Sequence, residues 1–317
     1  MPAVTIDCPS MQKARIEYSV VVPLMNEEEN VELLHDRIVD AFEAMGKPYE
    51  IIFVDDGSTD KTVNILEKIR LRDKNLNVIK FRKNFGQSAA MGAGFRFSRG
   101  EIIIAMDGDL QNDPADIPKL VAKLDDGFDV VSGWRKNRKD KMIIRKLPSR
   151  IANRLIQFLT RVEIHDTGCS LKAYRKEIIK KVRVYGELHR FIPALARIEG
   201  AKVGEVVVTH HPRKFGKSKY KITRTFKVVM DLTTLNLLMK YLSSPMRFFG
   251  LLGITFHFFG ILALFSILYC VSILGYTLED INVLLSTAFI LLAGGFQSFF
   301  FGLLAQIVVR TGDRTRI

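Results

Sequence analysis

The stretch Tyr49-Glu-Ile-Ile-Phe-Val-Asp-Asp-Gly-Ser-Thr-Asp60 decides the fold class of this chain. An apolar run of strand length ends in Asp55 and Asp56, and a polar turn that can cap a helix follows it. Comparable strand-like runs cover residues 18–23, 76–81, 101–106 and 129–131, and helical patterns cover 31–45, 61–72 and 87–97. Strands that alternate with helices of about 10 to 15 residues predict an α/β fold with a mostly parallel sheet and flanking helices.

Acidic clusters follow the predicted strands. Asp55-Asp56 and Asp107-Gly-Asp109 both stand at carboxyl ends of strands, where ligands bind in such sheets. The chain has no Gly-x-Gly-x-x-Gly after its first strand and no Gly-Lys-Ser/Thr loop, so the phosphates of a nucleotide need another binding device. Two acids separated by one residue can share a divalent cation that bridges a diphosphate and makes it a better leaving group.

Two long apolar runs near the C-terminus predict a membrane anchor. Residues 248–274 carry no charge, and residues 283–309 contain only Gln297, Gln306 and small hydroxyl residues as polar interruptions. About 20 apolar residues suffice for a spanning helix, so each run can cross a bilayer with some tilt. His257 is the most polar residue of the first run, and neither run holds an Asp, Glu, Lys or Arg that would mark an ion path. We therefore expect two transmembrane helices that serve as an anchor, with small residues that also permit a homo-oligomer.

The charges that flank these runs predict their orientation. Lys240 and Arg247 precede the first run, whereas Arg310, Arg314 and Arg316 follow the second, and the turn between the runs is acidic. Positive flanks mark the cytoplasmic side of a membrane. The pattern predicts a multi-pass protein of the cell membrane with its soluble part and both termini in the cytoplasm.

The net charge of +13 indicates an anionic partner. Basic side chains concentrate in residues 135–150 and 213–227, and the chain lacks the aromatic-basic motifs of nucleic-acid recognition. We therefore expect no nucleic acid, but a phosphorylated substrate or lipid headgroups. The three cysteines are scattered without disulfide or metal spacing, which fits a reducing compartment.

Several stretches together resemble the family-2 glycosyltransferases, which have a GT-A fold. They are Val21-Val-Pro-Leu-Met-Asn-Glu27, Val54-Asp-Asp-Gly-Ser-Thr-Asp60, Asn84-Phe-Gly-Gln87, Met106-Asp-Gly-Asp-Leu-Gln-Asn-Asp-Pro114, Asp166-Thr-Gly-Cys169 and Arg213-Lys-Phe-Gly-Lys-Ser-Lys-Tyr220. With two apolar runs behind them, they are most similar to the polyprenyl-phosphate glycosyltransferases, which include dolichol-phosphate mannose synthase and the bacterial GtrB-type enzymes. The resemblance covers about 200 residues in the order of the family.

The resemblance implies a role for each matching residue on the donor side. Pro23, Met25 and Glu27 would line the base and ribose pocket, and Asp56, with Asp55, would hydrogen-bond the base. Asp107 and Asp109 would hold Mg²⁺ or Mn²⁺ on the diphosphate, with Gln111 as a third oxygen ligand.

The resemblance places Asp166 near the acceptor, and Asp166 and Asp109 are the two predicted catalytic residues. A polyprenyl phosphate is already ionised near neutral pH, so we expect Asp166 to orient the acceptor or stabilise charge on the sugar, with general-base catalysis as the second role. Arg213, Lys217 and Lys219, with Arg135 beside them, are the predicted ligands of the acceptor phosphate or the leaving diphosphate.

The expected reaction is a metal-dependent, inverting transfer of glucose from UDP-glucose to undecaprenyl phosphate at the cytoplasmic membrane face. GDP-mannose and an amino-arabinose donor stay open. The predicted organisation is an N-terminal tail (1–17), a catalytic domain (18–220), interfacial helices (221–245), the two-helix anchor (246–310) and a short tail (311–317).

Two other functions fit the pattern less well. A processive polysaccharide synthase carries a Gln-x-x-Arg-Trp motif, but the only tryptophan, Trp134, follows Val130-Val-Ser-Gly133. A non-enzymatic protein that binds lipid through its basic face would have no use for Asp107 and Asp109.

Overall fold

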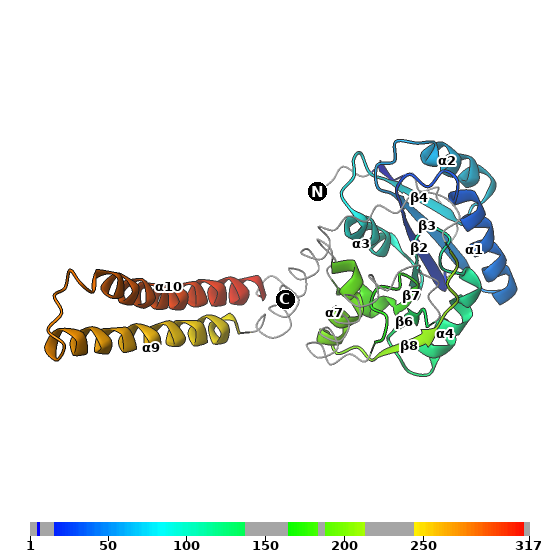
Figure 1. Cartoon of the computed structure of the whole chain (residues 1–317). Helices are drawn as coiled ribbons and strands as arrows, with labels where there is room; N and C mark the ends of the chain where they lie inside the picture. Colours follow the sequence, from blue (N-terminus) through cyan, green and yellow to red (C-terminus); the bar gives the residue numbers. More distant parts are fainter. Residues whose placement is uncertain (1–4, 7–15, 137–163, 183–187, 213–243, 314–317) are drawn as a thin grey trace. The chain divides into compact units, whose positions relative to one another are not determined.

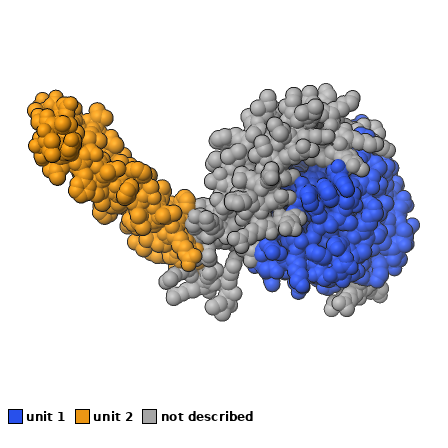
Figure 2. Space-filling model, turned by 60° about the horizontal axis from the view of Figure 1, so that its bottom comes forward, with its two compact units in different colours: residues 1–232 blue, residues 233–317 orange. Residues whose placement is uncertain are grey.

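The computed structural model describes residues 5–6, 16–136, 164–182, 188–212 and 244–313. The chain divides into two compact units, residues 1–232 and 233–317 (Figure 2). This division falls within the predicted interfacial segment 221–245, nearly all of which lies outside the described residues. The domain boundaries therefore stay a prediction, and the two units are described separately below.

The first unit is built on one mixed sheet with the strand order β1-β4-β3-β2-β5-β7-β6-β8 (Figure 1). Neighbouring strands from β4 to β5 are parallel, with Val22 of β2 opposite Phe53 of β3 and Val20 opposite Ile104 of β5. The strand β7 runs antiparallel between β5 and β6, and β8 is parallel to β6. The strands are β1 (Thr5–Ile6), β2 (Tyr18–Leu24), β3 (Tyr49–Asp55), β4 (Leu76–Lys80), β5 (Ile102–Ala105), β6 (Val130–Trp134), β7 (Lys172–Arg175) and β8 (Val203–Val207).

Helices cover both faces of this sheet, which explains why its strands are apolar almost throughout. Along β2, Val20 and Val22 belong to one hydrophobic cluster and Val21 to the other, and β3 and β5 alternate in the same way. The first cluster includes side chains of α1 (Val31–Met45), α2 (Thr62–Arg72) and α4 (Ile117–Asp125). The second includes side chains of α3 (Gln87–Phe97), α6 (Lys176–Ile179) and α7 (Ile192–Ile198) (Figure 1). Two short 3₁₀ turns, η1 (Pro114–Asp116) and η2 (Leu188–Phe191), precede α4 and α7.

The predicted α/β fold is confirmed, and the ranges 31–45 and 87–97 are helices with those bounds. The sequence did not predict β7 and β8. Lys172 and Arg175 give β7 charged ends, and β8 is only partly buried with Glu205 at its centre, so neither strand carries a clear apolar pattern. The predicted tail also contains Thr5 and Ile6, which form the short edge strand β1 and pair with β4.

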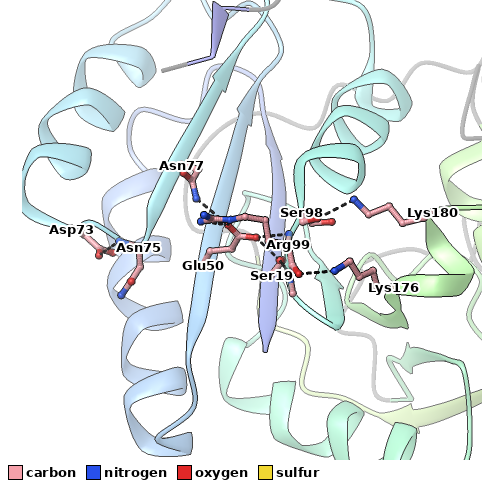
Figure 3. Close-up of polar contacts among 10 residues, drawn as sticks. Ser19, Glu50, Asp73, Asn75, Asn77, Ser98, Arg99, Lys176 and Lys180 are labelled. Carbon is pink, nitrogen blue, oxygen red and sulfur yellow. Dashed lines mark hydrogen bonds and ion pairs between the residues drawn. The ribbon is translucent and has the colours of Figure 1, made fainter. Parts of the chain in front are cut away.

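A cluster of buried polar side chains lies at the amino ends of β2 and β3 (Figure 3). The Glu50 carboxylate is 1% exposed and accepts hydrogen bonds from the Ser19 hydroxyl at 2.7 Å and the Asn77 amide at 3.2 Å. Arg99 adds its backbone N–H at 2.7 Å and its guanidinium Nε at 2.8 Å. Lys176 and Lys180 bind carbonyl oxygens of Arg99 and Ser98, both at 2.9 Å. This cluster fixes the connection from α3 to β5.

The second unit is a pair of long helices, α9 (Pro245–Ser272) and α10 (Asn282–Asp313). They pack closely where glycines face large side chains, as Gly253 faces Phe299 and Gly260 faces Leu292. By length and composition both are able to cross a membrane, as the sequence predicted. Most of their other large apolar side chains are exposed, which suits contact with lipid.

Candidate active site

The predicted site residues that the structure describes all lie at the carboxyl edge of the central strands. Pro23 and Met25 stand at the end of β2, Asp55 and Asp56 at the end of β3, and Asp107 and Asp109 just after β5. Arg135 directly follows β6. Asp166 precedes β7, whose antiparallel direction brings its first residue to this same edge. One edge of the sheet thus gathers residues that are far apart in the sequence.

Hydrogen bonds join two loops at the predicted base pocket. The backbone N–H of Asn26 donates to the Ser58 hydroxyl at 2.9 Å, and the Thr59 N–H donates to the Asn26 side-chain oxygen at 2.8 Å. The Glu27 N–H donates to the Thr62 hydroxyl at 2.9 Å. Asn26 has a φ of 53°, a left-handed conformation that asparagine tolerates better than most residues. These contacts fix Pro23, Met25 and Glu27 relative to the Asp55-Asp56 turn.

Asp55 and Asp56 are both buried and organise the loops around them. Asp55 accepts from the Ser58 N–H at 3.2 Å. Asp56 accepts from the N–H groups of Phe85 at 2.7 Å and Gly86 at 2.9 Å, one on each oxygen. Burial raises the pKa of Asp56 in spite of these two amides. Each carboxylate oxygen can accept a second bond, so the assignment of Asp56 to the base stays a prediction.

The pair Asp107 and Asp109 has the electrostatics of a cation site. Burial and the nearby Asp109 carboxylate raise the pKa of Asp107. The Gln87 amide donates to Asp107 at 2.6 Å, and the Gln111 N–H donates to Asp109 at 3.2 Å. Two acids that repel each other in a buried site are stabilised by a divalent cation.

The chain is closely packed at Gly108, between these two acids. A Cβ on Gly108 would lie 2.5 Å from a Leu24 methyl carbon and 3.7 Å from the Glu27 side chain. The close approach brings the Asp107–Asp109 turn against the loop that carries Pro23 and Glu27. The predicted metal and nucleotide residues are therefore neighbours.

Arg135 and Asp166 form a two-pronged ion pair. The guanidinium donates from Nε to one Asp166 oxygen at 2.7 Å and from Nη2 to the other at 3.0 Å. Burial alone would lower the pKa of Arg135, but the Asp166 carboxylate outweighs it and raises that pKa. With this pairing Asp166 fixes the orientation of a permanent cation, and its role toward the acceptor stays a prediction.

The chain segment before Arg213 is attached to the loop that follows the acids. The His211 N–H donates to the Gln111 carbonyl at 2.9 Å, and its ring contacts Asp113 at 2.9 Å. Asn112 and His210 form an antiparallel bridge. Arg213, Lys217 and Lys219 themselves lie outside the described residues, so their role stays a prediction.

Several residues of this edge were not assigned from the sequence. Gln87 binds Asp107, and Ser170 hydrogen-bonds both Asp107 and Asn112. Lys172 is buried beside Asp107 and Asp166. The sequence around Lys172 gave no signal of its burial, because Ser170-Leu-Lys-Ala-Tyr-Arg175 has no clear apolar pattern.

Among the described residues, no group of three or more His, Cys, Asp or Glu side chains could hold a metal ion. Two carboxylates fit a different kind of metal site, since Mg²⁺ commonly binds through one or two protein carboxylates and the phosphates of its substrate. Asp107 and Asp109 fit such a site.

Comparison with known proteins defines the class. The model of glycosyl transferase family 2 matches residues 19–183. A dodecaprenyl-phosphate galacturonate synthase of Rhizobium johnstonii is 44% identical over 302 residues, which cover 93% of this chain and 88% of the relative. The chain belongs to glycosyl transferase family 2 and is a glycosyltransferase.

Solved structures agree on the fold. Glucosyl-3-phosphoglycerate synthase from Mycobacterium tuberculosis, in complex with Mn²⁺ and UDP-glucose, matches with a TM-score of 0.53 and 19% identity, over 71% of this chain and 79% of that chain. S. aureus TarS 1-349, in complex with UDP-GlcNAc, matches with a TM-score of 0.51 and 20% identity, over 71% and 68%. These similarities confirm the predicted GT-A architecture.

Proposed function

We propose that this glycosyltransferase transfers a sugar from a UDP-sugar to a polyprenyl phosphate at a membrane surface. The observation that carries the proposal is the joint position of Asp107 and Asp109 with the Arg135–Asp166 pair at one edge of the sheet. The first pair suits a donor diphosphate and the second suits an anionic acceptor. The 44% identity to a dodecaprenyl-phosphate galacturonate synthase supports the acceptor class.

On the donor side, Asp107 and Asp109 would hold Mg²⁺ or Mn²⁺ together with the diphosphate, and Gln111 would add an oxygen ligand. When bound, the cation stabilises the charge that grows on the leaving diphosphate. Gln87 holds the Asp107 carboxylate in place. The mutually attached loops at residues 26 and 58–62 would keep Pro23, Met25, Glu27 and Asp56 around the base and ribose.

On the acceptor side, the lipid phosphate needs no general base because it is already ionised near neutral pH. Arg135, oriented by Asp166, would bind this phosphate so that one of its oxygens faces the anomeric carbon. A single displacement there breaks the bond to the diphosphate and inverts the configuration, so an α-linked donor gives a β-linked product. Arg213, Lys217 and Lys219 would add to this anion site.

The identity of the donor sugar is the most specific part of the proposal. The name of the similar galacturonate synthase favours a galacturonate donor over the glucose expected from the sequence. The helices α9 and α10 would anchor the enzyme with its catalytic unit and both termini in the cytoplasm, as the basic residues around them predict.

The test is a transfer assay with the full-length protein in lipid nanodiscs that contain undecaprenyl phosphate and Mn²⁺. UDP-galacturonate, UDP-glucose and GDP-mannose are supplied in turn, and sugar-phosphate lipid is detected by mass spectrometry. We expect transfer from a UDP-sugar, loss with a chelator, and recovery with Mn²⁺ or Mg²⁺. The acceptor assignment fails if the enzyme consumes UDP-sugars but never glycosylates the lipid phosphate.

A further inference from the structure

Lys172 is a buried lysine at the carboxyl edge of the sheet. It is the first residue of β7, where it pairs in register with Ala105 of β5 on one side and Ser132 of β6 on the other. Its relative exposure is only 3%. Lysine usually keeps its ammonium group in water, so a fully covered one needs an explanation.

The ammonium group of Lys172 is poorly satisfied. Its Nζ donates to the Thr167 carbonyl at 3.3 Å, which is its one hydrogen bond to the residues described by the structure. The Ser132 hydroxyl opposite it is fully buried and has no hydrogen-bond partner in that same part of the chain. An ammonium group has three N–H donors, so most of its lost hydration is not replaced by protein contacts. Burial accordingly lowers the pKa of Lys172 to about 8.

Charged groups of both the donor side and the acceptor side of the site interact with Lys172. The Asp166 and Asp107 carboxylates attract its charge, and the Arg135 guanidinium repels it. Lys172 therefore lies between the acid assigned to the donor side and the ion pair assigned to the acceptor side.

The loop 166–170 connects the same two halves. Asp166 at its start holds Arg135, and Ser170 at its end hydrogen-bonds Asp107 and Asn112. The Cys169 thiol contacts the Asn112 side-chain oxygen at 3.7 Å. Thr167, whose carbonyl accepts from Lys172, stands in the middle of this loop. A shift of the loop would therefore move the Arg135–Asp166 pair relative to Asp107.

We propose that Lys172 is a positioning residue for the transfer reaction. Its ammonium group holds the Thr167 carbonyl and so fixes the loop 166–170 between Asp107 and the Arg135–Asp166 pair. The proposal rests on the proposed function, because the two halves that it connects are the donor and acceptor sides of that reaction. A buried charge with so few partners costs stability, and a functional role explains why the fold contains it.

The decisive variant is Lys172→Met, which keeps the length of the side chain and removes its charge. We expect kcat to fall roughly 30- to 100-fold, since small displacements of reacting groups have effects of this size. The KM for the UDP-sugar should change less than about 3-fold, because the base and ribose residues follow β2 and β3, whereas Lys172 belongs to β7 on the other side of β5.

Two further variants make the result specific. Lys172→Arg retains the charge and should recover part of kcat. Lys176→Met makes the same change four residues along, where the lysine binds the Arg99 carbonyl at the opposite edge of the sheet. It should leave kcat within about 2-fold of the wild type. A normal kcat in Lys172→Met overturns the positioning role.

A measurement without turnover separates this proposal from the proposed function. Hydrogen exchange of the full-length protein should show faster exchange of the backbone amides in residues 167–170 of Lys172→Met, with α1 and α3 unchanged. Unchanged protection of this loop overturns the proposal even if the wild type transfers sugar. If the wild type transfers none of the sugars tested but the loop loosens as expected, the proposed donor and acceptor are wrong and the positioning contact stands.

Discussion

The two ends of the central strands differ in the charged groups that surround their buried acids. At the amino ends, the Glu50 carboxylate meets the Arg99 guanidinium, and the Ser19 hydroxyl and the Asn77 amide add further donors. At the carboxyl ends, the Asp107 carboxylate faces another carboxylate, that of Asp109, and the pKa of Asp107 is raised. The amino end thus pairs its buried acid with a base, whereas the carboxyl end keeps two acids close together, with Arg135 and Lys172 nearby.

Helix α3 connects these two ends. Gln87 at its start donates to Asp107, and Ser98 and Arg99 just after it belong to the Glu50 cluster. The amino end therefore fixes the helix whose other end holds an acid of the site. The difference teaches that the buried charges of this fold have two purposes, and that substitutions at the two ends should separate stability from activity.

The largest expected effect is that of Asp109→Asn. Loss of this carboxylate should lower kcat by about 1,000-fold at ordinary Mn²⁺ concentrations, since electrostatic stabilisation of the leaving group is lost. The melting temperature should not fall, because the repulsion with Asp107 is relieved. Steady-state kinetics with a melting curve measure both. A near-normal rate would remove Asp109 from the metal site.

A smaller effect is expected for Arg135→Lys on the acceptor side. Lysine keeps the charge but cannot reproduce the two-pronged contact with Asp166. The value of kcat/KM for the lipid phosphate should fall about 30-fold. Binding of UDP with Mn²⁺, followed by the fluorescence of Trp134, the only tryptophan, should stay unchanged. Equal losses for nucleotide and lipid would contradict a role on the acceptor side.

At the amino end, Glu50→Gln should change stability with little effect on the reaction. The substitution replaces the charge that the Arg99 guanidinium binds and leaves buried donors without full partners. We expect the free energy of unfolding to fall by roughly 2 kcal/mol. Below the melting transition, kcat should stay within about 2-fold of the wild type. A large loss of kcat in fully folded protein would mean that the two ends of the sheet are not separable.

The sequence predicted the acids of the site but not their supports. Asp107 and Asp109 belong to a short pattern after an apolar strand, and the bounds of α1 and α3 follow from regular apolar spacing. Gln87 ends the matching stretch Asn84-Phe-Gly-Gln87, but its role was not assigned, and Lys172 and Ser170 belong to none of the matching stretches. The positions of Lys172 and Ser170 depend on the antiparallel register of β7, which places Lys172 beside the end of β5. Pairings of this kind join residues distant in the sequence, and a single short strand carries no signal for its register.

The smallest expected effect concerns the pair Ser88 and His189, which secures the first turn of α3 near the site. The Ser88 hydroxyl and the His189 ring nitrogen Nδ1 are 2.8 Å apart. Burial, and then the charge of Arg190, lowers the pKa of His189 to about 3 from an ordinary value of 6.5. Above pH 6.5 neither the folded nor the unfolded histidine binds a proton, and the stability is complete. As the pH falls below 6.5 the unfolded chain binds the proton first, so stability decreases towards pH 3.

Between pH 7.5 and 5.5 the wild type should lose about 1.4 kcal/mol more of its free energy of unfolding than His189→Asn. Chemical unfolding followed by Trp134 fluorescence at both pH values measures this difference. Identical pH dependence in the two proteins would show that folded His189 binds its proton as readily as the unfolded chain does. The Ser88–His189 contact would then not make the stability of the protein depend on pH.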